Sequence, residues 1–169
     1  MYKDDRGFLQ DSAPYIHITA NDAILKEWQR IDVKEDTYLT VLDGKAMRYS
    51  RGLFNEFYKA YQFPDYIIKD WTYFDEAMNE LDWIHAKHFI LGIHDADQLL
   101  GGFGMKWYRN QFWEIMSGII TEWVNGRNYD DFPTPPTPFH IILSVPHEKQ
   151  EKFVRNLKKL SKLEIEIIN

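Results

Sequence analysis

Strand-like and helix-like segments alternate along this 169-residue chain, and no other feature limits its fold as strongly. Near the start, residues 14–20 have the pattern of a short strand and residues 21–31 that of a helix. Near the end, residues 147–162 place apolar side chains at helical spacing, and residues 163–167 alternate apolar and acidic side chains, as an edge strand does. Such alternation favours an α/β fold with helices packed against a mainly parallel sheet.

One predicted helix follows Asp70, which we expect to be its N-cap. Its apolar residues recur at intervals of three and four, which places them on one face of the helix. They are Trp71, Phe74, Met78 and Leu81. The opposite side, with Tyr73 at its edge, is strongly acidic. It carries Thr72, Asp75, Glu76, Asn79 and Glu80.

The acidic side of this helix has two interpretations. Many surface helices carry a charged face that only contacts water. Alternatively, the face is a docking surface, because Glu76 and Glu80 repel each other at a spacing of four residues and a basic partner would turn that repulsion into attraction.

The residues around this helix occur in an order typical of one known family. The segments are a strand ending in Asp-Gly at residues 38–44, Leu-Phe at residues 53–54, Phe-Pro-Asp-Tyr at residues 63–66, Trp71, and Leu-Asp-Trp at residues 81–83. A hydrophobic strand at residues 88–94, a long helix ending near Trp123 and a last strand at residues 139–145 follow in the same order. Over roughly residues 38–145 the chain therefore resembles the barstar family.

This resemblance implies both a fold and a function. The fold is a three-stranded, mainly parallel sheet with helices packed against it, within a single domain that spans residues 1–169. Residues 1–37 and 146–169 then add strand and helix elements at the two ends of the core. Barstar-like proteins are intracellular inhibitors that cover the active site of a ribonuclease, so the resemblance implies an immunity protein that binds a basic toxin, most simply a ribonuclease.

The family's binding residues are carried over position by position. Tyr66 retains the tyrosine of the binding loop, and Glu76 matches the second of two inhibitory carboxylates. Thr72 replaces the first carboxylate, Asp75 replaces an aromatic residue, and Ile68 replaces a loop glycine, so we expect a changed partner and a changed loop path. The residues expected to contact the partner are Tyr66, Asp70, Thr72, Tyr73, Asp75, Glu76 and Glu80.

The composition of the chain agrees with a binding protein of the cytoplasm. There is no cysteine, so neither a disulfide framework nor a thiolate metal site is available, and we expect no cofactor. No N-terminal signal segment or apolar run of membrane-spanning length is present. The net charge is −6, and residues 1–146 hold 14 basic against 22 acidic side chains. A basic protein is therefore a better expected partner than a nucleic acid.

Catalysis is the alternative from a different functional class. Asp75 and Glu76 are adjacent, and His85, His88 and His94 follow, so a hydrolase that uses these groups is conceivable. Neighbouring helix positions diverge by about 100°, however, which prevents two such carboxylates from flanking one bond. Residues 101–104, Gly-Gly-Phe-Gly, lack the Lys-Ser/Thr of a phosphate-binding loop and are expected to form a flexible turn. We therefore predict no enzymatic activity. Two alternatives stay open: binding of a non-nuclease partner through the terminal additions, and a hydrolase that uses Asp75, Glu76 and a histidine.

Overall fold

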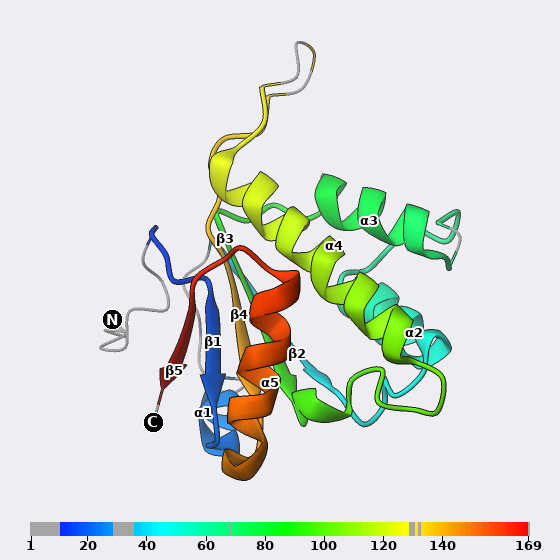
Figure 1. Cartoon of the computed structure of the whole chain (residues 1–169). Coiled ribbons are helices and arrows are strands. Elements are labelled where there is room, and N and C mark those ends of the chain that lie inside the picture. The colour runs from blue at the N-terminus through cyan, green and yellow to red at the C-terminus, as the bar shows by residue number, and fades with distance from the viewer. Residues whose placement is uncertain (1–10, 29–35, 68, 129–130, 132, 169) are drawn as a thin grey trace.

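The computed structural model of the chain describes residues 11–28, 36–67, 69–128, 131 and 133–168 (Figure 1). Strands and helices alternate as the sequence predicts. The elements are β1 (Ile16–Thr19), α1 (Asp22–Trp28), β2 (Thr37–Asp43), α2 (Ser50–Ala60), α3 (Trp71–Glu80), β3 (His88–His94), the short 3-10 helix η1 (Ala96–Gln98), α4 (Lys106–Asn125), β4 (Phe139–Ser144), α5 (His147–Leu160) and β5 (Ile165–Ile168). The C-terminal end of the helix predicted at residues 21–31 lies outside the described residues.

The five strands form one sheet in the order β2-β3-β4-β1-β5, and all neighbouring strands are parallel. The strands β2, β3 and β4 are adjacent, as expected of a three-stranded core. The added strands β1 and β5 extend the sheet beyond β4, with β5 at the edge as its alternating pattern predicts. The predicted α/β class and the elements added at both ends are thus confirmed.

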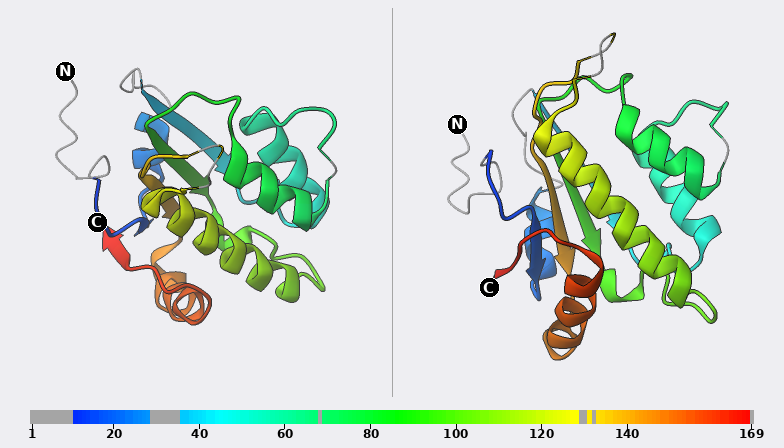
Figure 2. Two further views of the ribbon diagram at one scale, coloured as in Figure 1. Left: turned by 90° about the horizontal axis from the view of Figure 1, so that it is seen from above. Right: turned by 45° about the horizontal axis from the view of Figure 1, so that its top comes forward.

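Helices cover both faces of the sheet, and most of them lie on one side (Figure 2). On the larger side, Phe89, Leu91 and Ile93 of β3 share a buried core with the helices α2, α3, α4 and α5. On the other side, Ile24 and Leu25 of α1 pack against a small apolar cluster of the sheet. Alternate residues of each strand are therefore buried against different helices, as the two-residue period of a strand requires.

The helix predicted at residues 147–162 forms α5, and its apolar stripe packs on the core. Leu157 is buried, whereas Phe153 and Leu160 are half-buried against the same cluster. Phe153 meets the ring of Trp113 edge-on, with 6.0 Å between the ring centroids. Among the described residues, no helix has both the length and the apolar composition needed to cross a membrane.

Candidate functional site

Helix α3 lies at the outside of the helical layer, where aromatic contacts hold its inner face. Phe74 is buried and meets Phe57 of α2 edge-on at a centroid distance of 5.1 Å. Trp71 is half-buried and packs on Phe54 at 5.0 Å. In addition, the indole nitrogen of Trp123 on α4 donates a hydrogen bond of 2.9 Å to the carbonyl oxygen of Met78. The apolar stripe predicted from the sequence therefore fixes the helix in place.

Both ends of α3 are set by local interactions. A side-chain oxygen of Asp70 accepts a hydrogen bond of 2.9 Å from the backbone N–H of Tyr73, which confirms Asp70 as the N-cap. At the other end, Leu81 adopts a left-handed conformation with φ of 38° while its side chain is buried. The chain then turns to Trp83, whose indole donates to the carbonyl oxygen of Tyr61 at 2.8 Å.

Most of the predicted contact residues are open to solvent. Thr72, Tyr73, Glu76 and Glu80 are exposed on α3. Tyr66 is 76% exposed on the loop that leads into the helix, so its ring is available to a partner. Ile68, which was predicted to change the path of this loop, lies outside the described residues.

Asp75 differs from the position that the helical spacing predicted for it. It is half-buried rather than exposed, and the side-chain amide of Asn79 donates to its carboxylate at 3.0 Å. Burial raises the pKa of Asp75 above its ordinary value, and the nearby carboxylates of Glu122 and Glu76 raise it further. The helical spacing predicted that Asp75 projects from the exposed side of α3. The structure corrects this to a half-buried position, because the C-terminal half of α4 lies beside this edge of α3.

Glu122 of α4 is an acidic neighbour that the sequence did not reveal. The negative charge of Glu122 raises the pKa of Asp75, so the two carboxylates lie near each other. Since Glu122 is exposed, α3 and α4 together form one acidic surface. An ion pair with a residue near the end of α4 partly compensates the charge of Glu122, since Nε of Arg127 lies 3.5 Å from its Oε2 atom. No local pattern links residues so distant in the sequence, and only the packing of α4 against α3 brings them together.

The histidines considered for a hydrolase lie elsewhere. His88 contacts Asp11 at 3.2 Å and His94 contacts Asp22 at 3.5 Å, while His85 is exposed. Within the described ranges, no contact joins any of them to Asp75 or Glu76. The combination of two carboxylates and a histidine that hydrolysis would need is therefore not assembled around α3.

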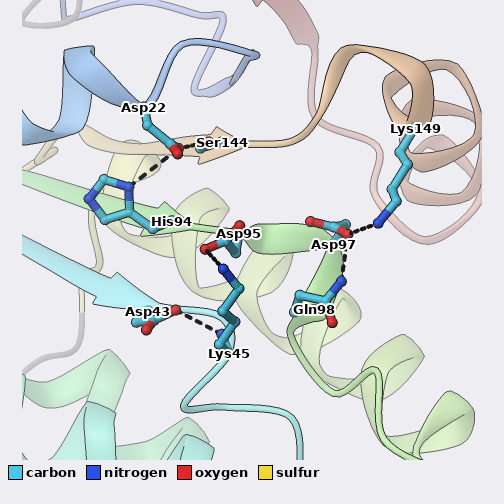
Figure 3. Close-up of polar contacts among 9 residues, drawn as sticks. All are labelled: Asp22, Asp43, Lys45, His94, Asp95, Asp97, Gln98, Ser144 and Lys149. Atoms are coloured by element: carbon cyan, nitrogen blue, oxygen red, sulfur yellow. Dashed lines mark hydrogen bonds and ion pairs between the residues drawn. The ribbon is translucent and has the colours of Figure 1, made fainter.

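A second polar cluster occupies the carboxyl ends of the parallel strands (Figure 3). There Asp22 accepts a hydrogen bond from the hydroxyl of Ser144 and contacts Nδ1 of His94. The carboxylate lies between the serine and the histidine, whereas nucleophilic catalysis requires the histidine to contact the serine. Around it, Lys45 pairs with Asp95 and Lys149 pairs with Asp97. In the part of the chain that the structure describes, no group of three or more His, Cys, Asp or Glu side chains could hold a metal ion.

Comparison with known proteins identifies the family. The model of the family described as Barstar (barnase inhibitor) matches residues 37–134, which run from the start of β2 through α3 and α4. The match ends before β4, earlier than the resemblance at residues 38–145 predicted. Neither the curated proteins nor the solved structures contain a match to the chain. Because the matched segment covers more than half of its length, the chain belongs to the barstar family.

Proposed function

We propose that this protein is an inhibitor that binds a basic protein toxin, in the simplest case a ribonuclease, and covers its active cleft. The exposed acidic side of α3, held in place by a buried aromatic face, is the observation that carries the proposal. The membership in the barstar family supports it, since the family description names barnase inhibitors. The absence of cysteine fits action in the cytoplasm.

The physical basis of the proposed inhibition is imitation of a phosphate chain. A ribonuclease cleft is lined by cations that bind RNA phosphates, and a rigid row of carboxylates can occupy the same positions. On α3 the exposed members of this row are Glu76 and Glu80, and Asp75 and Glu122 add negative potential at its edge. Tyr66 and Tyr73 add exposed aromatic area with a polar end, which suits contact residues.

The replacement of a family carboxylate by Thr72 shifts this charge along the helix. Negative charge is lost near the N-terminal end of α3 and gathers between α3 and α4, around Asp75, Glu76 and Glu122. The partner's cations should be shifted in the same direction. We therefore expect this protein to select a ribonuclease whose cleft differs from that of barnase.

The proposal is tested by reversing charge on the two exposed acidic residues of α3. Because Asp75 is half-buried, Glu76→Lys with Glu80→Lys is the cleaner double variant. Tagged wild-type protein should capture a basic nuclease from native lysate and inhibit its cleavage of RNA. The double variant should bind that nuclease at least about 100-fold more weakly, since like charges facing each other at an interface cost several kcal/mol.

A matched control carries the same change of charge on α5. Glu148→Lys with Glu151→Lys alters two exposed residues far from α3, and it should leave capture and inhibition unchanged. Equal capture by the α3 variant and the wild type would refute the assignment of the site. Capture of a protein without nuclease activity would refute the ribonuclease as partner.

The α5 variant also examines a second candidate function, which is binding of a non-nuclease partner through the terminal additions. One observation favours it: a groove of about 490 Å³ lies between α5 and β5, lined by residues that include Val154, Arg155 and Ile167. The family match does not include either element. A partner that is lost from the α5 variant but kept by the α3 variant would support this function instead.

A further inference from the structure

Three of the most exposed aromatic side chains lie at one end of the molecule. Phe103 is 97% exposed, Trp107 is 63% exposed and Tyr49 is 51% exposed. Phe103 belongs to the glycine-rich loop that precedes α4, Trp107 to the first turn of α4, and Tyr49 to the residue before α2. We call the surface formed by these residues and the cations next to them the aromatic pole.

One backbone contact and one side-chain contact place the two segments of the aromatic pole side by side. The N–H of Gly102 donates to the carbonyl oxygen of Arg48 at 3.0 Å, and the hydroxyl of Ser50 contacts the sulfur of Met105 at 3.9 Å. A Cβ atom at Gly102 would come within 2.4 Å of the Tyr49 ring, so only glycine lets the ring lie this close to the loop. The sequence predicted a flexible turn at residues 101–104, whereas the structure ties Gly102 to the loop before α2.

The aromatic pole is continuous with the proposed inhibitory site through a row of rings. Trp107 meets Tyr108 edge-on at a centroid distance of 5.0 Å, and Tyr108 stacks on Trp71 at 6.2 Å. Trp71 is the first residue of α3. The ring of Trp107 is held by its neighbour Tyr108, so it loses little conformational entropy when a partner covers it, which favours its use as a contact residue.

The charge of the aromatic pole is opposite to that of α3. Residues 44–55 and 99–113 contain no aspartate or glutamate. They contain five cations, of which Lys45 pairs with Asp95. The other four are Arg48, Arg51, Lys106 and Arg109, and within the described ranges none of these four takes part in an ion pair. These two segments of an acidic protein therefore carry a net positive charge, and they fit a partner that carries negative charge next to apolar groups.

The neighbourhood of α3 decides which class of partner fits. A nucleic acid or an anionic membrane would be attracted by the four cations, but the same polyanion would extend to the carboxylates of α3 and be repelled there. A second copy docked pole to pole would bring like charges together. A protein surface can alternate in sign across a single interface, and aromatic and arginine side chains dominate the binding energy of such interfaces.

We propose that the aromatic pole is the second half of the inhibitory interface. The partner that places its basic cleft on α3 would also place an apolar pocket edged by carboxylates on Phe103, Trp107 and Tyr49. This inference rests on the proposed function, since the same partner must engage both surfaces.

Site-specific photo-crosslinking of the full chain in native cells tests the inference. The photoreactive residue p-benzoylphenylalanine is placed in three separate proteins at Phe103 of the pole, Tyr66 before α3, or Lys152 of α5. Adducts are identified by mass spectrometry. We expect the first two positions to give an adduct with the same polypeptide and Lys152, which is exposed on a different helix, to give none.

Each other outcome overturns a defined part of the inference. An adduct at Tyr66 without one at Phe103 refutes the pole and leaves the proposed function intact. An adduct at Phe103 with a different polypeptide, a lipid or RNA refutes the shared interface, and no adduct at either position refutes the inference together with the α3 site.

Affinity for the shared polypeptide gives the quantitative check. Phe103→Ser with Trp107→Ser should weaken its binding by at least about tenfold, because exposed aromatic anchors at the centre of an interface contribute most of its binding energy. Ile167→Ser on β5 removes an exposed apolar side chain from a different part of the sheet and should leave the affinity for this polypeptide unchanged. Equal affinities of the double variant and the wild type would refute the pole.

Discussion

At the scale of single residues, Asp75 shows how the proposed binding surface can reduce the stability of the folded protein. Its carboxylate is half-buried between α3 and α4 beside two other acidic groups, and its pKa is raised above the ordinary value by burial, by Glu122 and by Glu76. Above its folded pKa, Asp75 is ionised in surroundings that disfavour the charge. A cationic partner would relieve this unfavourable state.

We predict that Asp75→Asn raises the free energy of unfolding by about 0.5 kcal/mol at pH 7, an amount typical of partly screened like charges. The amide can still accept the hydrogen bond from Asn79. An acid whose pKa is raised by folding destabilises the folded state only above its unfolded pKa. The stability advantage of Asp75→Asn over the wild type should therefore be absent in acid and should grow as pH rises through the folded pKa of Asp75. Urea unfolding of both proteins across this range measures the difference.

The difference between the two proteins reports on Asp75 and its interaction with Glu76 and Glu122, because carboxylates that do not interact with Asp75 titrate equally in both. If the stability advantage of Asp75→Asn were the same in acid and at neutral pH, the charge of Asp75 would not be its cause. A loss of stability at pH 7 would show that Asp75 is better accommodated as a carboxylate than its neighbours imply.

At the scale of elements, Asp70 at the start of α3 has an observed structural role and a predicted binding role. Its side chain caps the helix through the N–H of Tyr73, and the same residue was predicted to contact the partner. Two substitutions separate the roles. Asp70→Ala removes the cap and the charge, whereas Asp70→Ser keeps a capping oxygen and removes only the charge.

We predict that Asp70→Ala lowers the free energy of unfolding by about 1 kcal/mol, while Asp70→Ser changes it by a few tenths of that amount or less. Thermal and urea unfolding give both values. If the carboxylate contacts the partner, both variants should bind it equally weakly despite their different stabilities. If instead only the less stable Asp70→Ala variant bound the partner weakly, the role of Asp70 would be limited to capping the helix.

At the scale of the whole molecule, charge is segregated rather than spread. The acidic surface of α3 and α4 carries the sign of the net charge of −6, while the aromatic pole and α5 are basic. A dipolar surface of this kind orients an approaching basic protein before contact. Steering of this type acts on the rate of association and is screened by salt.

We predict that the association rate with the captured nuclease falls by about tenfold between 0.05 M and 0.5 M salt, while the dissociation rate changes little. Stopped-flow fluorescence measures both rates. Glu76→Lys with Glu80→Lys should flatten the dependence on salt. Phe103→Ser, which removes no charge, should keep the dependence and accelerate dissociation; a flat dependence in the wild type would contradict steering.

Much of the fold could be predicted from local patterns. Three- and four-residue spacing identified α3, alternation identified the edge strand β5, and Asp70 was recognisable as an N-cap. Within the candidate site, the same spacing correctly predicted that Glu76 and Glu80 are exposed. It failed for Asp75, because a helical period describes only which residues share a face and not which second helix lies beside that face.

The sequence by itself determined the α/β class, the family and the identity of the acidic helix, because these depend on interactions between residues close in the chain or on an ordered set of motifs. Only the tertiary structure brought Glu122 to Asp75 and the loop at Phe103 to Tyr49. Both pairs join segments far apart in the sequence, whose approach depends on how the helices pack on the sheet. Packing of this kind is fixed by the shape of the whole core, which no local pattern encodes.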